Sequence, residues 1–202
     1  AQRRLWFLDR LDPASGAAYR IGAALRLSGP LRADALEHAL ADVVARHEIL
    51  RTRFVDRAGE PEQCIDPPSR RFALARSDLA ALDATERDSR LHALCGEEAK
   101  MPFDLERDPL MRARLIGLSD EEHVLVLTQH HIVSDGWSIG VLVREVAALY
   151  AARLAGEDDP LPPLPLQYAD YASWQRGRLS GDAYEAQLSA WHSALAGAPI
   201  LS

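Results

Sequence analysis

Apolar positions follow two different spacings along the chain, and the spacing predicts which segments are strands and which are helices. Apolar residues that alternate with polar ones, or that run together, predict strands at residues 19–28, 50–55, 62–65, 72–74, 109–118 and 123–129. Apolar residues three and four positions apart predict helices at residues 31–44, 84–99, 137–154 and 168–195, the last split in two at Ser180-Gly181. Strands and helices therefore alternate, which predicts an α/β (α+β) fold with a mixed sheet flanked by helices.

Turn-forming residues separate the predicted elements. The segment AGEP at residues 58–61 predicts a hairpin between the second and third strands. The polar turn SDEE at residues 119–122 joins the two longest strands, which we expect to be neighbours. Residues 155–165 are rich in Gly, Asp and Pro and predict a linker before the C-terminal helices.

Length, composition and charge exclude several classes of protein. A chain of 202 residues with 48% apolar content can bury a core and predicts one large domain or lobe. Neither a long apolar run nor a signal peptide is evident, so we expect a cytoplasmic protein without a membrane span. The net charge of −7 argues against a nucleic-acid partner. Cys64 and Cys95 have no CxxC spacing, which fits packing roles in a reducing compartment.

The stretch HHIVSDG at residues 130–136 is the strongest candidate for a functional site, because it directly follows the apolar run at 124–128. Histidine changes charge near neutral pH and is the usual proton acceptor when a nucleophile attacks a carbonyl. Adjacent residues of an extended segment point to opposite faces, so one histidine should face a site while the other packs inward. The same spacing offers no metal site. Gly136 permits backbone angles and a close ligand approach that other residues forbid.

The start of the helix after this stretch adds to the candidate site. Ser134, Asp135 or Ser138 could cap that helix, whose first amides carry partial positive charge. Such an environment suits a carbonyl or thioester oxygen that gains negative charge during acyl transfer.

Four segments together resemble the condensation domains of nonribosomal peptide synthetases. They are AQRRLWFL at residues 1–8, RHEILRTRF at 46–54, HHIVSDGWS at 130–138 and YADYASW at 168–174. They occur in the family's order, and the family's later motifs are absent. The resemblance implies a domain of two lobes similar to chloramphenicol acetyltransferase, with the active site in a tunnel between them. Residues 1–202 are then expected to be the N-terminal lobe.

The resemblance also implies roles for individual residues. His131 would accept a proton from the acceptor's α-amine or orient that amine, and the sequence leaves both roles open. His130 would hold the loop by packing or hydrogen bonding. Asp135 would form a structural ion pair with an arginine of the second motif, Arg46 or Arg51, with Arg46 favoured.

Residues after the aspartate are the candidate substrate contacts. Gly136 would leave room for the donor's phosphopantetheine arm, and Trp137 and Ser138 begin the next helix. Trp137 is nevertheless expected to lie in the core rather than to bind a ligand.

The remaining motif residues have structural or undecided roles. Leu50 and Phe54 are expected in the core, as are Tyr168, Tyr171 and Trp174, which have helical spacing. Arg3 and Arg4 could pair with acids or contact a carrier protein's phosphate.

The implied activity is amide bond formation between a donor acyl thioester and an acceptor α-amine, each held on the phosphopantetheine of a carrier protein. The subtype that joins two L-configured residues is most similar, because the chain lacks the Pro-Leu-Gln opening of D-donor domains and the aspartate-rich motif of cyclisation domains. Expected partners are two carrier proteins, the C-terminal lobe and an adenylation domain, with no directly bound cofactor. The isolated lobe is expected to be inactive and to self-associate. Two alternatives remain: a coenzyme A-dependent acyltransferase of the same superfamily, and a non-catalytic lobe that docks carrier proteins.

Overall fold

The computed structural model describes residues 2–11, 18–69, 71–178 and 181–198. The chain divides into two compact units, Ala1–Pro163 and Leu164–Ser202. Among the described residues, no helix is long and apolar enough to cross a membrane.

A four-stranded mixed sheet forms the centre of the first unit, with the strands in the order β1-β6-β5-β4. The strands are β1 (Arg20–Ser28), β4 (Leu74–Asp78), β5 (Met111–Gly117) and β6 (Glu122–His130). β6 pairs antiparallel with both β1 and β5, whereas β4 pairs parallel with β5. The prediction of a mixed sheet with neighbouring β5 and β6 is therefore confirmed.

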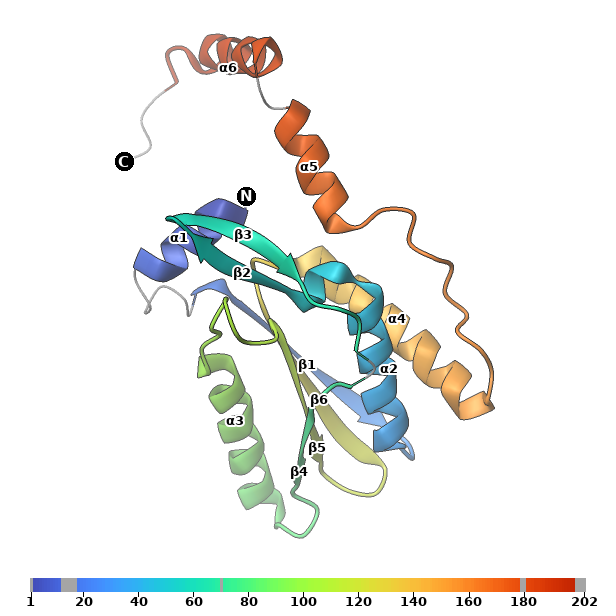
Figure 1. Ribbon diagram of the computed structural model, residues 1–202. Coiled ribbons are helices and arrows are strands. Elements are labelled where there is room, and N and C mark those ends of the chain that lie inside the picture. The colour runs from blue at the N-terminus through green and yellow to red at the C-terminus, as the bar shows by residue number, and fades with distance from the viewer. Residues whose placement is uncertain (1, 12–17, 70, 179–180, 199–202) are drawn as a thin grey trace. The chain divides into compact units, whose positions relative to one another are not determined.

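Helices cover both faces of this sheet (Figure 1). α2 (Ala33–Arg46) and α4 (Gly136–Ala155) lie on one face, and α3 (Ala84–Lys100) lies on the other. The two helices on the first face pack along each other. The sequence prediction of helices flanking the sheet is thus correct for all three.

The central strand β6 explains why its sequence is a continuous apolar run. Leu125 and Leu127 pack into the larger core with α2 and α4, whereas Val124 and Val126 pack into the smaller core with α3. Because alternate residues of a strand face opposite sides, a strand covered on both faces needs apolar residues at every position.

A separate hairpin holds the second motif near the sheet. A short 3-10 helix (Glu48–Arg51) leads into β2 (Thr52–Arg57), which pairs antiparallel with β3 (Glu60–Ile65). The two turn residues Ala58 and Gly59 both have positive φ, 55° and 89°, which matches the twist of a two-residue hairpin loop. Leu50 and Phe54 are buried, as predicted.

An N-terminal helix, α1 (Gln2–Leu11), was not predicted from the sequence. It packs against β3 (Figure 1). Trp6 is its only buried residue among those described. Its apolar residues lie at positions 5–8 and 11, a run that does not give a clear helical spacing.

The second unit contains α5 (Tyr168–Arg178) and α6 (Asp182–Leu195). The prediction that Tyr168, Tyr171 and Trp174 form core is wrong, because α5 has no buried residue. These three rings contact one another along the helix instead, with both centroid distances at 5.8 Å. Of the predicted split, Ser180 lies outside the described residues, and Gly181 precedes α6 with a φ of 62°.

Candidate active site

The HHIVSDG stretch forms the loop between β6 and α4, as the sequence predicts. His130 is the last residue of β6, and Gly136 is the first residue of α4. The His130 amide donates to the Leu110 carbonyl at 3.1 Å, and the His131 amide donates to the Tyr19 carbonyl at 2.7 Å. The backbone of the two histidines is thereby bonded to the segments that precede β5 and β1, the two neighbours of β6.

His130 is buried and faces inward. Its Nδ1 accepts a hydrogen bond from the Ile132 amide at 3.1 Å, so its Nε2 carries the hydrogen and lies 3.6 Å from Asp9 Oδ1. Burial lowers the pKa of His130 despite the nearby carboxylate, which keeps the ring neutral. Its ring also packs against Tyr19 and Phe103. These contacts hold the loop and do not present His130 to a substrate.

His131 points in the opposite sense and is exposed. Its Nδ1 lies 2.7 Å from the Ser134 carbonyl oxygen. A carbonyl can only accept, so Nδ1 must carry the hydrogen, which leaves the lone pair on Nε2. The accessible nitrogen of this ring is therefore the one that can take a proton.

Ser134 is itself held in place by a second hydrogen bond. Its side chain is buried and donates to Gln129 Oε1 at 2.7 Å, while its carbonyl receives His131. Both the hydroxyl and the carbonyl of Ser134 therefore take part in hydrogen bonds.

The predicted ion pair between Asp135 and an arginine is wrong. Asp135 is exposed and caps α4, and its Oδ1 accepts from the Ser138 amide at 2.8 Å and the Ser138 hydroxyl at 2.6 Å. These two bonds are the main reason that the pKa of Asp135 is lowered. The sequence named Asp135 as one of three possible caps, and the cap is the role that the structure gives it.

Arg46 and Arg51 have other partners. Arg46 Nε lies 3.4 Å from Glu145 Oε2 on α4, and its Nη2 donates to the Pro162 carbonyl at 2.6 Å. Arg51 donates to the carbonyls of Ala45 and Asp66. Because Arg46 ends α2 and α2 packs along α4, its side chain meets the third turn of α4 rather than the loop before it.

His47 completes this contact between the second motif and α4. Its Nε2 lies 2.6 Å from the same Glu145 Oε2, and all three side chains are largely buried. We refer to Arg46, His47 and Glu145 as the α2–α4 clamp. An arginine of the second motif therefore does form a structural ion pair, but with Glu145.

The residues at the start of α4 differ in part from the predictions. Gly136 does not have positive φ, so no special backbone angle requires glycine there. A Cβ at this position would meet no atom within 4 Å, which means that the space beside the helix start is open. Trp137 is 82% exposed, so the prediction that it belongs to the core is wrong. The hydrogen bonds of Ser138 go to Asp135.

Gln2 of the opening motif is a site residue that sequence reasoning missed. Its Nε2 donates to the Ile132 carbonyl at 2.8 Å, and its Oε1 accepts from Gln63 at 2.5 Å. It therefore ties the histidine loop to β3. Its neighbour Arg3 pairs with an acid, Glu60, which is one of the two roles that the sequence left open.

The second and third motifs meet at a cavity of about 140 Å³ beneath the loop. Its wall contains His47 and Leu50 from the second motif and Ser134, Trp137 and Ser138 from the third. His131 contacts this wall through Ser134.

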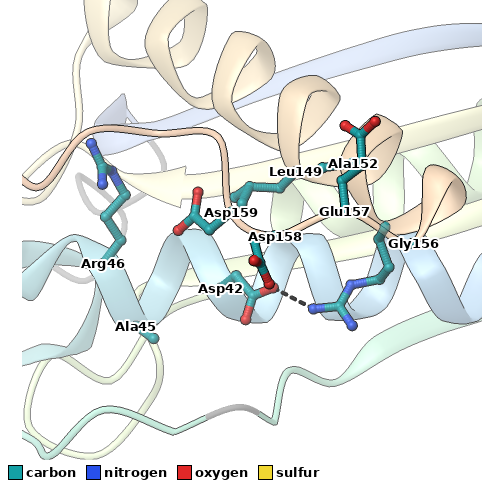
Figure 2. A pocket seen from close by; sticks show the side chains of 10 residues that line it. Asp42, Ala45, Arg46, Leu149, Ala152, Gly156, Glu157, Asp158 and Asp159 are labelled. Carbon is teal, nitrogen blue, oxygen red and sulfur yellow. Dashed lines mark hydrogen bonds and ion pairs between the residues drawn. The ribbon is translucent and has the colours of Figure 1, made fainter.

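A larger hollow of about 890 Å³ lies at the other end of α4 (Figure 2). Its wall is acidic, with Asp42, Glu157, Asp158 and Asp159, and Arg153 donates to Asp42 at 2.6 Å. Within the described residues, no group of histidine, cysteine and acidic side chains could hold a metal ion. The hollow contains no residue of the histidine loop, so the candidate active site remains at the start of α4.

Comparisons with known proteins agree with the motifs. The model of the family described as "Condensation domain" matches residues 1–202. The chain is 46% identical over 201 residues to malpinin synthetase from Mortierella alpina, a match that covers 100% of this chain and 2% of that protein. It is 44% identical over 203 residues to phosphinothricin tripeptide synthetase from Streptomyces viridochromogenes, with coverage of 98% of this chain and 18% of that protein.

A solved condensation domain gives a further likeness. The first condensation domain of the CDA synthetase has a TM-score of 0.84 at 27% identity, and the match covers 98% of this chain and 50% of that one. The X-domain in a solved complex of the X-domain and OxyB from teicoplanin biosynthesis has a TM-score of 0.83 at 38% identity, with coverage of 100% of this chain and 44% of that one. The chain thus spans about half of these solved chains and a small part of the synthetases. The whole-length family match establishes that the chain belongs to the condensation domains of nonribosomal peptide synthetases.

Proposed function

We propose that residues 1–202 are the N-terminal lobe of a condensation domain that joins two carrier-bound groups. In the proposed reaction, the acceptor's α-amine nitrogen attacks the carbonyl carbon of the donor thioester. The amide C–N bond forms, the C–S bond breaks, and the donor's phosphopantetheine leaves as the thiol. The amine loses one proton, which passes to a base and from there to the departing sulfur.

The orientation of His131 is the observation that carries this proposal. The ring is exposed, and the Ser134 carbonyl holds the hydrogen on Nδ1, so Nε2 is available to accept the proton or to position the amine. Both roles use the same atom, and both need this tautomer.

The start of α4 supports the same chemistry. The open space at Gly136, beside the first turn of the helix, leaves room for a phosphopantetheine arm. We further propose that donor and acceptor are both L-configured, on the basis of the motif resemblance. Proposed partners are two carrier proteins, the C-terminal lobe and an adenylation domain.

A second candidate function is docking without catalysis. It is favoured by the likeness to the X-domain, which was solved as a complex with OxyB. A coenzyme A-dependent acyltransferase has less support, because a relative that is 44% identical is a tripeptide synthetase.

An assay with two loaded carrier proteins separates these functions. The complete domain is mixed with a donor aminoacyl carrier and an acceptor aminoacyl carrier, and intact-protein mass spectrometry follows the acceptor. We expect dipeptide on the acceptor carrier only when both carriers are loaded. Carrier binding without product would favour docking, and equal rates with a coenzyme A thioester as donor would favour the acyltransferase.

A further inference from the structure

The cavity between the second motif and the start of α4 has a mainly apolar wall. Six aliphatic side chains line it, namely Val43, Ile49, Leu50, Val133, Val141 and Leu142. We propose that this cavity receives an apolar side chain of leucine or phenylalanine size from one of the two groups that are joined. This inference rests on the proposed function and adds a substrate preference to it.

The size of the cavity sets the class of side chain. At about 140 Å³ it is close to the volume of an apolar cavity that accommodates a benzene ring. An alanine side chain would leave much of it empty, and side chains of leucine or phenylalanine size would fill it. A long charged side chain would have to be buried without a partner.

Four polar side chains of the wall already have hydrogen-bond partners. Gln129 and Ser134 bond to each other, Ser138 bonds to Asp135, and His47 bonds to Glu145. A polar substrate group would therefore compete with existing hydrogen bonds, whereas an apolar group would leave them in place.

The cavity is also close to the reacting position. Ser134 lines it and, through its carbonyl, holds the His131 ring at 2.7 Å. Trp137 lines the cavity while remaining 82% exposed, so the cavity reaches the surface on which α4 begins. A substrate side chain that enters this cavity therefore belongs to a donor or acceptor group whose reacting atoms lie near His131.

Val141 offers the sharpest test, because it lines the cavity and is only partly buried. The test compares Val141→Phe, which fills the cavity, and Val141→Ala, which enlarges it, in the complete domain. Val143→Ala is the matched control, since Val143 lies on the same helix and packs on the core without lining the cavity. One substrate series varies the donor between alanyl and leucyl, and the other varies the acceptor in the same way.

We expect Val141→Phe to lower the leucyl-to-alanyl ratio of kcat/KM by about tenfold or more in either the donor series or the acceptor series. The series that responds shows whether the side chain in the cavity comes from the donor or from the acceptor. Val141→Ala should raise that ratio, and Val143→Ala should leave it unchanged. Melting temperatures show whether the variants fold. If Val141→Phe does not fold, the Val141→Ala and Val143→Ala pair decides. An active wild type with unchanged ratios in every folded Val141 variant would overturn the inference, whereas a wild type that forms no product would overturn the proposed function and the inference with it.

Discussion

Single side chains hold the loop that carries His131 at the start of α4. Ser134 orients the ring, Asp135 caps the helix, and Gln2 reaches the loop from the opening motif. Local rules of the sequence predicted the cap and the opposite directions of the two histidines. The Gln2 bond, which spans 130 positions, and the exposure of Trp137 depend on how distant segments pack, which no local pattern contains.

Asp135→Ala should destabilise the domain by about 1 kcal/mol, the usual effect of losing a helix cap. Removing the carboxylate of a buried ion pair would cost several kcal/mol instead. Urea unfolding measures the difference, with Asp135→Asn expected to retain most of the stability and Asp120→Ala, in the exposed β5–β6 turn, as control. Because the folded-state pKa of Asp135 is lowered, its contribution is full at neutral pH and is lost as the pH falls through that lowered value. A loss above about 3 kcal/mol, the scale of a broken buried ion pair, would contradict the capping role.

Gln2→Ala should also lower stability by about 1 kcal/mol, because it removes the hydrogen bonds to Ile132 and Gln63. A double-mutant cycle with Gln63→Ala tests the shared bond. The two losses should add to more than the loss in the double variant. Strict additivity would show that the Gln2–Gln63 bond contributes nothing.

At the scale of elements, the sequence predicted the sheet strands, the hairpin and the three flanking helices within a few residues. Their spacing is set by which faces are buried, and burial leaves a periodic signal. The α2–α4 clamp could not be predicted in the same way. The partner of Arg46 depends on the register between two helices, and that register comes from packing.

Glu145→Ala should destabilise the domain by about 3 kcal/mol or more, because it leaves the largely buried Arg46 without its carboxylate. Glu97→Ala is the matched control, since Glu97 pairs with Arg90 on an exposed helix surface and should change stability by about 0.5 kcal/mol or less. Chemical unfolding of both variants gives the comparison. If Glu145→Ala and Glu97→Ala lose the same free energy of unfolding, the α2–α4 clamp stabilises the domain no more than a surface ion pair does.

At the scale of the whole molecule, the chain matches about half of the solved first condensation domain of the CDA synthetase. The motif resemblance implies a tunnel between two lobes, in which the second lobe would supply one wall. Trp137 lies beside the histidine loop and is exposed, which fits a surface that the second lobe covers. We therefore expect residues 1–202 alone to form no amide product.

The same surface should make the isolated chain self-associate. Multi-angle light scattering is expected to show a dimer or larger species at high protein concentration, and Trp137→Ser should shift the distribution towards monomer. A strict monomer at all concentrations would contradict this expectation.

His131→Ala in the complete domain tests the central claim most directly. Loss of the proton-accepting or amine-positioning ring should lower the rate of condensation between loaded carriers by about 100-fold or more. The melting temperature should change little, because the ring is exposed. His92→Ala, which removes an exposed histidine on α3, should keep the wild-type rate. A folded His131→Ala domain that condenses at the wild-type rate would contradict the account.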